Sequence, residues 1–215
     1  MSNYRPVSVL PVFISLRKSC VWSILNHLDV NNIITKSQNG FRNGRSTESA
    51  LINFTNYIIN KFESRQSVIA VILDLSKAFD TVAHDILLAK LNHYGVRSLS
   101  LNWFSNYLNN RNQCVKFQNS ISSVKNIISF VPQESVISPI LFILYINDIV
   151  NTNNLLNFTS YADDSVLYMS DANIENLINT LNIELNIVNR WLLCKKLTLN
   201  INKTFFLLFL GEKTI

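Results

Sequence analysis

The chain has 215 residues, of which 48% are hydrophobic and 15% are charged. This balance excludes an intrinsically disordered chain, which buries too little apolar surface to fold, and a long solvated coiled coil, which carries more charge. Nineteen basic residues against 14 acidic ones give a net charge of +5, which permits an anionic partner such as nucleic acid. The 3 cysteines are far apart, so they offer neither a disulfide framework nor a zinc-ligand spacing.

The N-terminal third is predicted to hold one helix and one buried strand. The first 35 residues read as irregular, with only a short apolar run at Val21 to Leu28. The pair Ser46–Thr47 offers an N-cap for a helix whose apolar residues recur at helical spacing from Ala50 to Ile58. Ser67 to Leu75 is a nearly continuous β-branched run that ends at a carboxylate, Asp74. Such a run is typical of a strand buried on both faces.

The rest of the chain is predicted to alternate helices with short strands. Helices are expected at Asp85–Tyr94, Leu99–Leu108, Ile140–Ile149 and, as a long amphipathic helix, from Ile174 to Leu192. Strands are expected at Gln113–Gln118, Val124–Phe130, Phe158–Tyr161, Ser165–Met169, Leu197–Leu199 and Phe205–Leu210. Two of these strands meet at a turn made by Ala162, Asp163 and Asp164. The order of elements indicates a mixed α+β chain.

No segment reads as a targeting signal or a membrane span. The N-terminus, MSNYRPVSVL, lacks the charged and then apolar layout of a signal peptide. The longest apolar stretch, Pro139 to Ile146, is far shorter than the ~20 residues that cross a bilayer. We therefore expect an intracellular chain with no membrane partner, and the choice between nucleus and cytoplasm stays open.

Three aspartates stand where a negative charge is costly. Asp74 ends a very apolar strand, and a buried carboxylate without a partner is unfavourable. Asp163 and Asp164 are adjacent at a hairpin and repel each other unless a cation lies between them. Carboxylates gathered at one sheet edge suit Mg²⁺, and two such ions can assist phosphoryl transfer. The alternative is that Asp163 and Asp164 are simply turn residues, because aspartate is common in turns.

Five sequence blocks resemble those of reverse transcriptases and occur in that family's order. They are NYRPVSVL near the N-terminus, NGFRNGRSTE (Asn39–Glu48), LDLSKAFDTV (Leu73–Val82), VPQESVISPILFILYINDI (Val131–Ile149) and YADD (Tyr161–Asp164). Their form, and that of the late segment LNINKTFFLLF, is similar to the polymerase of non-LTR (LINE-type) retrotransposons. An unrelated Mg²⁺ phosphotransferase would explain the carboxylates but not five ordered blocks.

The resemblance implies an α+β fold of the right-hand polymerase type, with fingers and an antiparallel palm sheet backed by helices. Residues 1–66 would be fingers-like, and residues 67–215 would be the palm with a fingers-type insertion around 97–131. The chain is then expected to end before the thumb. The implied activity is that of an RNA-directed DNA polymerase, which adds a dNTP to the 3′-hydroxyl of a DNA primer on an RNA template. The oligomeric state stays open.

The resemblance also implies roles for individual residues. Asp74, Asp163 and Asp164 would be catalytic and would bind two Mg²⁺ ions, with Mn²⁺ as an alternative. Lys203 would protonate the pyrophosphate leaving group, or is an ordinary turn lysine. The nucleotide would be bound by a set of five residues: Arg42, Arg45, Phe79, Gln133 and Tyr161. Of these, Phe79 could equally be a core aromatic, and the two arginines could equally belong to a solvated loop.

The fourth block departs from the family pattern at its three glycine positions, which hold Phe130, Glu134 and Ser138. Glu134 brings a negative charge towards a polyanionic triphosphate. At an effective dielectric constant of 20, a pair of unit charges about 4 Å apart interacts by roughly 4 kcal/mol, here as repulsion. A second interpretation is therefore a degenerate or domesticated remnant that binds nucleic acid without catalysis.

Overall fold

The computed structural model describes residues 14–109, 112–118, 120–126, 129–131, 137–152 and 154–211. The chain divides into two compact units, and each is described by itself. The first unit comprises Met1–Ile33 and Phe79–Tyr145, and the second comprises Ile34–Ala78 and Ile146–Ile215. Each unit is thus assembled from two separate stretches of sequence.

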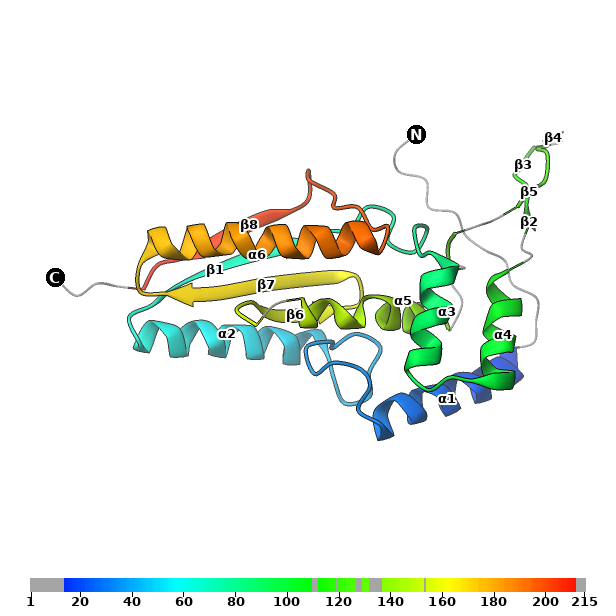
Figure 1. Cartoon of the computed structure of the whole chain (residues 1–215), viewed down its shortest axis with the longest axis horizontal. Helices are drawn as coiled ribbons and strands as arrows, with labels where there is room; N and C mark the ends of the chain where they lie inside the picture. Colours follow the sequence, from blue (N-terminus) through cyan, green and yellow to red (C-terminus); the bar gives the residue numbers. More distant parts are fainter. Residues whose placement is uncertain are drawn as a thin grey trace. The chain divides into compact units, whose positions relative to one another are not determined.

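The second unit is built on a four-stranded sheet in the order β6-β7-β1-β8 (Figure 1). Its central strands are β1 (Ser67–Leu73) and β7 (Asp164–Asp171), which pair in antiparallel register from Ser67 opposite Asp171 to Leu73 opposite Ser165. The edge strands are β6 (Asn157–Tyr161) and β8 (Phe205–Phe209), and both also pair in antiparallel fashion. The predicted neighbourhood of the Asp74 strand and the YADD hairpin in one antiparallel sheet is confirmed.

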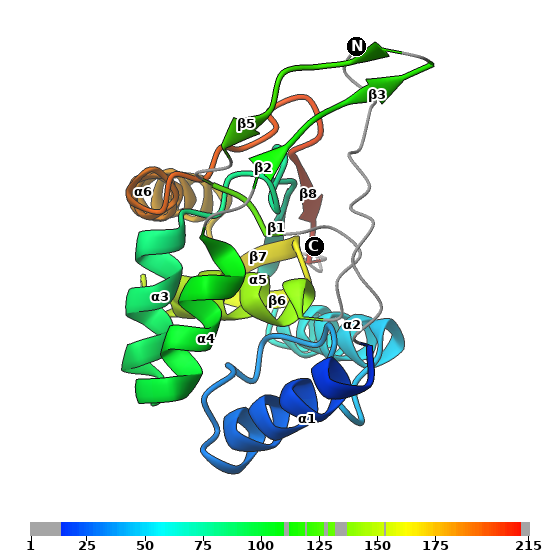
Figure 2. The same cartoon turned by 90° about the vertical axis from the view of Figure 1, so that its right-hand side faces the viewer.

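Two helices cover the opposite faces of this sheet (Figure 2). Helix α2 (Thr47–Glu63) contacts one face, because the rings of Phe54 and Tyr57 pack against Tyr168 of β7 at centroid distances of 5.0 and 4.7 Å. Helix α6 (Ile174–Cys194) packs against β1 and β7 on the other face, where its Leu192 lies beside Leu73 and Ser165. Side chains alternate between the faces of a strand, so Tyr168 and Ser165 point in opposite directions. Strand β1 is therefore buried on both faces, as its apolar sequence predicts.

The helix termini of the second unit follow their sequence signals. Ser46 is the N-cap of α2: its side chain accepts a hydrogen bond from the Ser49 N–H, and the Ser49 side chain accepts one from the Ser46 N–H. This reciprocal arrangement satisfies two N–H groups that have no partner within the helix. Asn173 caps α6 in a similar way by accepting from the N–H groups of Glu175 and Asn176.

The first unit is mainly helical. It contains α1 (Ile14–Val30), α3 (His84–His93), α4 (Ser98–Leu108) and most of α5 (Ser138–Ile146), which is followed by the 3-10 helix η1 (Asn147–Asn151). Two short pairs of strands lie between α4 and α5: β2 (Asn112–Gln113) with β5 (Lys125–Asn126), and β3 (Lys116–Phe117) with β4 (Ser120–Ile121). Fully buried side chains form its core, among them Leu28, Leu87, Leu91, Phe104 and Phe142.

Three sequence predictions about the first unit are corrected by the structure. Residues 14–30 form helix α1, although the sequence predicts an irregular segment. The prediction was wrong because the apolar residues of this segment do not recur with a clear helical period. Among the described residues of the strand expected at Val124–Phe130, only Lys125–Asn126 are in a strand, and Ser129 forms a single bridge with Ala83. Helix α5 begins at Ser138 rather than Ile140, with Pro139 in its first turn, where a missing N–H breaks no helical hydrogen bond.

Two further differences concern the second unit. The strand expected at Leu197–Leu199 is a single bridge between Leu199 and Leu75. Asp164 belongs to β7, since it pairs with Tyr161 of β6, so the hairpin turn is made by Ala162 and Asp163 alone. The turn is therefore tighter than the sequence suggested, and Asp164 is held by the sheet itself.

Candidate active site

Asp74 directly follows β1, and Asp164 begins the adjacent strand β7, at the same end of the sheet. The register of β1 and β7 joins Leu73 to Ser165, so the next position beyond this pair holds Asp74 on one side and Asp164 on the other. Residues opposite each other in neighbouring antiparallel strands have Cβ atoms about 4.5–5.5 Å apart. Asp163 lies in the hairpin turn, directly before Asp164. The fold therefore brings the three predicted catalytic carboxylates to one edge.

The neighbouring carboxylates act electrostatically on Asp164. The pKa of Asp164 is raised above its ordinary value, chiefly because partial burial disfavours its charged form and further because of the negative charges of Asp163 and Asp74. A like charge nearby raises a carboxyl pKa only when the groups are close. The site is thus a concentration of negative charge that a cation would relieve.

The donor set fits a divalent cation that takes part of its coordination from elsewhere. Within the described residues, no group of three or more His, Cys, Asp or Glu side chains is placed so that it could hold a metal ion by itself, as an all-protein cage would. Mg²⁺ seldom uses such a cage, because it keeps several water molecules and binds through one or two carboxylates together with substrate phosphates. Asp74, Asp163 and Asp164 offer oxygen atoms alone, which is the ligand chemistry that Mg²⁺ prefers.

A loop that precedes β8 holds Asp74 in place. Asn200 donates from Nδ2 to Asp74 Oδ2 at 2.7 Å, and its backbone N–H donates to the Asp74 carbonyl at 2.8 Å. The Asp74 N–H in turn donates to Thr204 Oγ1 at 3.4 Å. Sequence reasoning missed Asn200 and Thr204. The one signal for them was their place in LNINKTFFLLF, beside the predicted catalytic Lys203.

Lys203 belongs to the same loop. Its side chain is exposed, and its backbone N–H donates to the Asn200 carbonyl at 3.0 Å. The loop therefore links Lys203 through Asn200 to Asp74. This placement suits a proton donor near the carboxylates, and it suits an ordinary turn lysine equally well.

The two predicted nucleotide-binding arginines shape the loop before α2. Arg42 donates from Nη1 to the Thr35 carbonyl at 3.0 Å. Arg45 donates from Nη1 to the Lys36 carbonyl at 2.6 Å and to Asn39 Oδ1 at 3.3 Å. Tyr161, at the end of β6, is 38% exposed and pairs with Asp164.

Of the remaining predicted site residues, Phe79 lies in the other unit and Gln133 lies outside the described residues. Phe79 belongs to the first unit, where its ring packs on Phe142 with centroids 4.8 Å apart and its carbonyl accepts the Val131 N–H. These contacts agree with the core-aromatic alternative. Gln133 and Glu134 lie outside the described residues. In contrast, Asp74, Asp163, Asp164, Lys203, Arg42, Arg45 and Tyr161 all belong to the second unit.

One of the substituted glycine positions retains a backbone conformation that favours glycine. Phe130 has a φ of 136°, a value that residues with a side chain rarely adopt because Cβ meets the backbone. Hydrogen bonds hold it there: its N–H donates to the Val82 carbonyl at 3.1 Å, and its carbonyl pairs with His84 Nε2 at 2.8 Å. At position 130 the backbone therefore adopts a conformation that favours glycine although the residue is phenylalanine.

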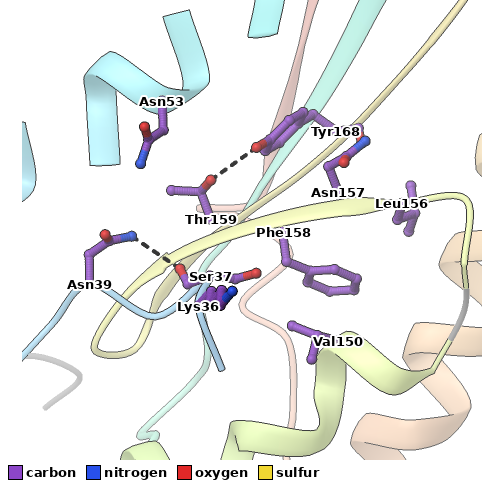
Figure 3. A pocket seen from close by; sticks show the side chains of 10 residues that line it. All are labelled: Lys36, Ser37, Asn39, Asn53, Val150, Leu156, Asn157, Phe158, Thr159 and Tyr168. Carbon is purple, nitrogen blue, oxygen red and sulfur yellow. Dashed lines mark hydrogen bonds between the residues drawn. The ribbon is translucent and has the colours of Figure 1, made fainter. Parts of the chain in front are cut away.

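A polar cavity of about 390 Å³ lies on the outer side of β6 in the second unit (Figure 3). Its lining residues are Lys36, Ser37, Asn39, Asn53, Val150, Leu156, Asn157, Phe158, Thr159 and Tyr168. Two hydrogen bonds cross its wall, from Asn39 Nδ2 to the Ser37 carbonyl at 3.1 Å and between the hydroxyls of Thr159 and Tyr168 at 3.1 Å. The three aspartates are not among the lining residues, so this cavity is distinct from the carboxylate edge.

Comparison with known proteins identifies relatives of this chain. A family model described as "Reverse transcriptase (RNA-dependent DNA polymerase)" matches residues 1–214. The chain is 29% identical over 214 residues to the probable RNA-directed DNA polymerase from transposon BS of Drosophila melanogaster, and it covers 23% of that protein with 93% of its own length. It is 30% identical over 203 residues to the RNA-directed DNA polymerase from mobile element jockey of the same organism, which corresponds to 89% of this chain and 22% of the relative.

Solved structures share the fold at low sequence identity. Telomerase from Candida albicans, solved with a TWJ fragment of telomeric RNA, superimposes with a TM-score of 0.65 at 14% identity, over 88% of this chain and 35% of the telomerase. Apo telomerase from Candida tropicalis gives a TM-score of 0.65 at 14% identity, over 93% of this chain and 37% of the telomerase. The fold is therefore that of the fingers and palm of an α+β polymerase.

The chain belongs to the reverse transcriptase (RNA-dependent DNA polymerase) family. Its resemblance to the polymerases of non-LTR retrotransposons, inferred from five ordered blocks, is confirmed by the transposon relatives. The chain spans less than a quarter of the length of these relatives, at 23% and 22%. None of the helices in the described part of the chain combines the length and the apolar character that a membrane crossing requires.

Proposed function

We propose that this chain carries the polymerase site of an RNA-directed DNA polymerase of the non-LTR retrotransposon type. Its reaction would add a dNTP to the 3′-hydroxyl of a DNA primer paired with an RNA template. The observation that carries this proposal is that Asp74, directly after β1, and Asp164, at the start of the neighbouring strand β7, lie beside Asp163, with the pKa of Asp164 raised by burial and by the charges of both other aspartates. Family membership supports the same conclusion.

In this proposal the three carboxylates hold two Mg²⁺ ions, with Mn²⁺ as an alternative. When bound, such ions supply positive charge to the attacking and leaving oxygens of a phosphoryl transfer. The chain's own contribution is to fix the ligands: the sheet register places Asp74 and Asp164, and Asn200 orients the Asp74 carboxylate through its 2.7 Å hydrogen bond. Lys203 would donate a proton to the pyrophosphate leaving group.

The nucleotide would be recognised by the residues that the family resemblance assigns to it. Arg42 and Arg45 would bind triphosphate oxygens, for which the planar guanidinium group is well suited. Tyr161 would pack near the primer end, while Gln133 and Phe79 would line the nucleotide pocket. As a division of the chain, we propose residues 1–66 as a fingers-like region and 67–215 as the palm, with a fingers-type insertion around 97–131.

A single-nucleotide extension assay tests this proposal. The protein is mixed in excess with a DNA primer on an RNA template, one dNTP, and Mg²⁺ or Mn²⁺, so that a weak grip on the duplex does not limit the reaction. We expect metal-dependent extension, which Asp163→Asn lowers by about 100-fold or more, since a lost metal ligand removes several kcal/mol of transition-state stabilisation. Asp171→Asn is the matched control, because Asp171 lies at the opposite end of β7.

The main competing function is nucleic-acid binding without catalysis. It is favoured by Glu134 and Phe130, which replace glycines of the fourth block. Template–primer binding by a protein that extends no primer with either metal would overturn the catalytic proposal and support this alternative. Extension that is equally fast in the Asp163→Asn variant would overturn the assigned site.

A further inference from the structure

The hairpin turn that carries Asp163 contains a residue in an unfavourable backbone conformation. Ala162 has a φ of 58°, and it is only 8% exposed. The left-handed region costs a residue with a Cβ about 1–2 kcal/mol. Such a conformation persists only where the surrounding structure holds it. The groups that contact Ala162 therefore determine the path of the chain into Asp163.

A single buried side chain, that of Gln38, bonds to both backbone groups of Ala162. Its Oε1 accepts the Ala162 N–H at 2.9 Å, and its Nε2 donates to the Ala162 carbonyl at 3.3 Å. The same Oε1 also accepts the Gly40 N–H at 2.8 Å. Gln38 is only 2% exposed, so water does not compete for these bonds.

The residues around Gln38 are joined to the outer edge of β6 by an isolated bridge. Gln38 and Ser160 form a parallel bridge, in which the Ser160 N–H donates to the Ser37 carbonyl at 2.9 Å and the Asn39 N–H donates to the Ser160 carbonyl at 2.8 Å. A Cβ at position 40 would lie 2.4 Å from the Ala162 nitrogen. The segment Ser37–Gly40 therefore reaches the turn only because residue 40 is glycine.

We propose that Gln38 is a positioning residue for the catalytic hairpin: it holds Ala162 in its left-handed conformation and thereby fixes Asp163 beside Asp74. This inference rests on the proposed polymerase function. Gln38 would act through its hydrogen bonds to the backbone of the turn. Neighbouring carboxylates repel each other, and a rigid backbone keeps them together in spite of that repulsion. Gly40 has the complementary role of permitting the close approach.

The test compares Gln38→Leu with a matched control, Gln66→Leu. Leucine keeps similar bulk but makes no hydrogen bond. Gln66 is also in the second unit, where it accepts a hydrogen bond from Ser170 Oγ at the other end of the sheet. We expect the Ala162 amide hydrogen to exchange about tenfold faster or more in Gln38→Leu, because roughly 1.4 kcal/mol, the loss of one or two hydrogen bonds, corresponds to a factor of ten. The control should leave this exchange unchanged.

Two further readouts separate positioning from general stability. At saturating dNTP, Gln38→Leu should lower the single-turnover rate about tenfold, with a much smaller change in the dNTP concentration for half-maximal rate. Mn²⁺ should also bind more weakly than in the control, because Asp163 is no longer held. Gly40→Ala should reproduce these effects, whereas Gly211→Ala, whose Cβ would lie 2.6 Å from the Gln66 carbonyl oxygen, should not.

Each outcome has a distinct meaning. Unchanged Ala162 exchange in both Gln38→Leu and Gly40→Ala would overturn the inference. Faster exchange with a single-turnover rate and Mn²⁺ affinity equal to those of Gln66→Leu would show that Gln38 orders the turn without positioning Asp163, which also overturns it. If the unaltered protein extends no primer, the proposed function fails, but Ala162 exchange and Mn²⁺ affinity still decide the role of Gln38.

Discussion

Replacing Asn200 with alanine isolates the hydrogen bond that orients the Asp74 carboxylate. The variant loses the 2.7 Å bond from Asn200 Nδ2 but keeps the bond from its backbone N–H to the Asp74 carbonyl. A hydrogen bond to a charged group contributes about 1.5–3 kcal/mol, and the lower end applies here because Asp74 is half-buried and water can replace the donor. We therefore expect a loss of about 1.5 kcal/mol, which lowers the melting temperature of a chain of this length by about 3–6 °C.

The same substitution is expected to weaken metal binding. Groups that orient a metal ligand typically change metal affinity by about 10- to 100-fold when they are removed. Titration of Mn²⁺ followed by electron paramagnetic resonance, together with thermal unfolding, measures both effects. Asn202→Ala is the matched control, since Asn202 is exposed and lies two residues further along the same loop. Equal Mn²⁺ affinity and equal melting temperature in the Asn200 and Asn202 variants would refute the assigned role of Asn200.

Three other predictions address the charges and glycine positions of the site. The pKa of Asp164 is raised in the folded protein, so folding favours the protonated carboxyl group over the charged one. This contribution to stability is fully present below the pKa of the unfolded chain and is lost as the pH rises through the pKa of the folded protein. Without metal, Asp164→Asn should therefore raise the free energy of unfolding at neutral pH, by less than about 1 kcal/mol at this exposed position, and this gain should vanish in acid. Urea unfolding at both pH values measures the change, and a lower free energy of unfolding at neutral pH in the variant would contradict the prediction. Phe130→Gly should be about 1–2 kcal/mol more stable than Phe130→Ala, since both remove the ring but only glycine relieves the φ of 136°; denaturation that favours alanine would contradict this. Glu134→Gly should raise single-nucleotide extension about tenfold, equivalent to roughly 1.4 kcal/mol, and Glu134→Gln separates charge from bulk; equal rates in all three proteins would show that Glu134 is tolerated.

The fold was predictable from the sequence where local signals and burial agree. The apolar run at Ser67–Leu73 forms the buried central strand, and the stripe from Ile174 to Leu192 forms the long helix α6. Helix α1 was missed because its apolar residues lack a clear period. Leu197–Leu199 reads as a strand, but its pairing is limited to one bridge, which depends on the path of the neighbouring loop. Local propensity does not determine which residues pair when they are far apart in the sequence.

The candidate site was predictable for residues that carry recognisable chemistry. The three aspartates stood out as costly charges and as members of family blocks, and the sheet brings them together. Gln38, Asn200 and Thr204 were missed because polar side chains that bond to backbone groups have no sequence pattern of their own. Their partners lie 124, 126 and 130 residues away. Only the folded chain shows that the loop before α2 and the loop before β8 both hold the aspartate edge.

The most direct test of the central claim is Mn²⁺ binding at the aspartate edge. We predict that Mn²⁺ titration, followed by electron paramagnetic resonance, detects binding to the unaltered protein, because the cation relieves the repulsion among Asp74, Asp163 and Asp164. Asp163→Asn should abolish or greatly weaken this binding, while Asp171→Asn at the far end of β7 should leave it unchanged. Mn²⁺ affinity that is the same in all three proteins would contradict the assignment of these carboxylates as a metal site.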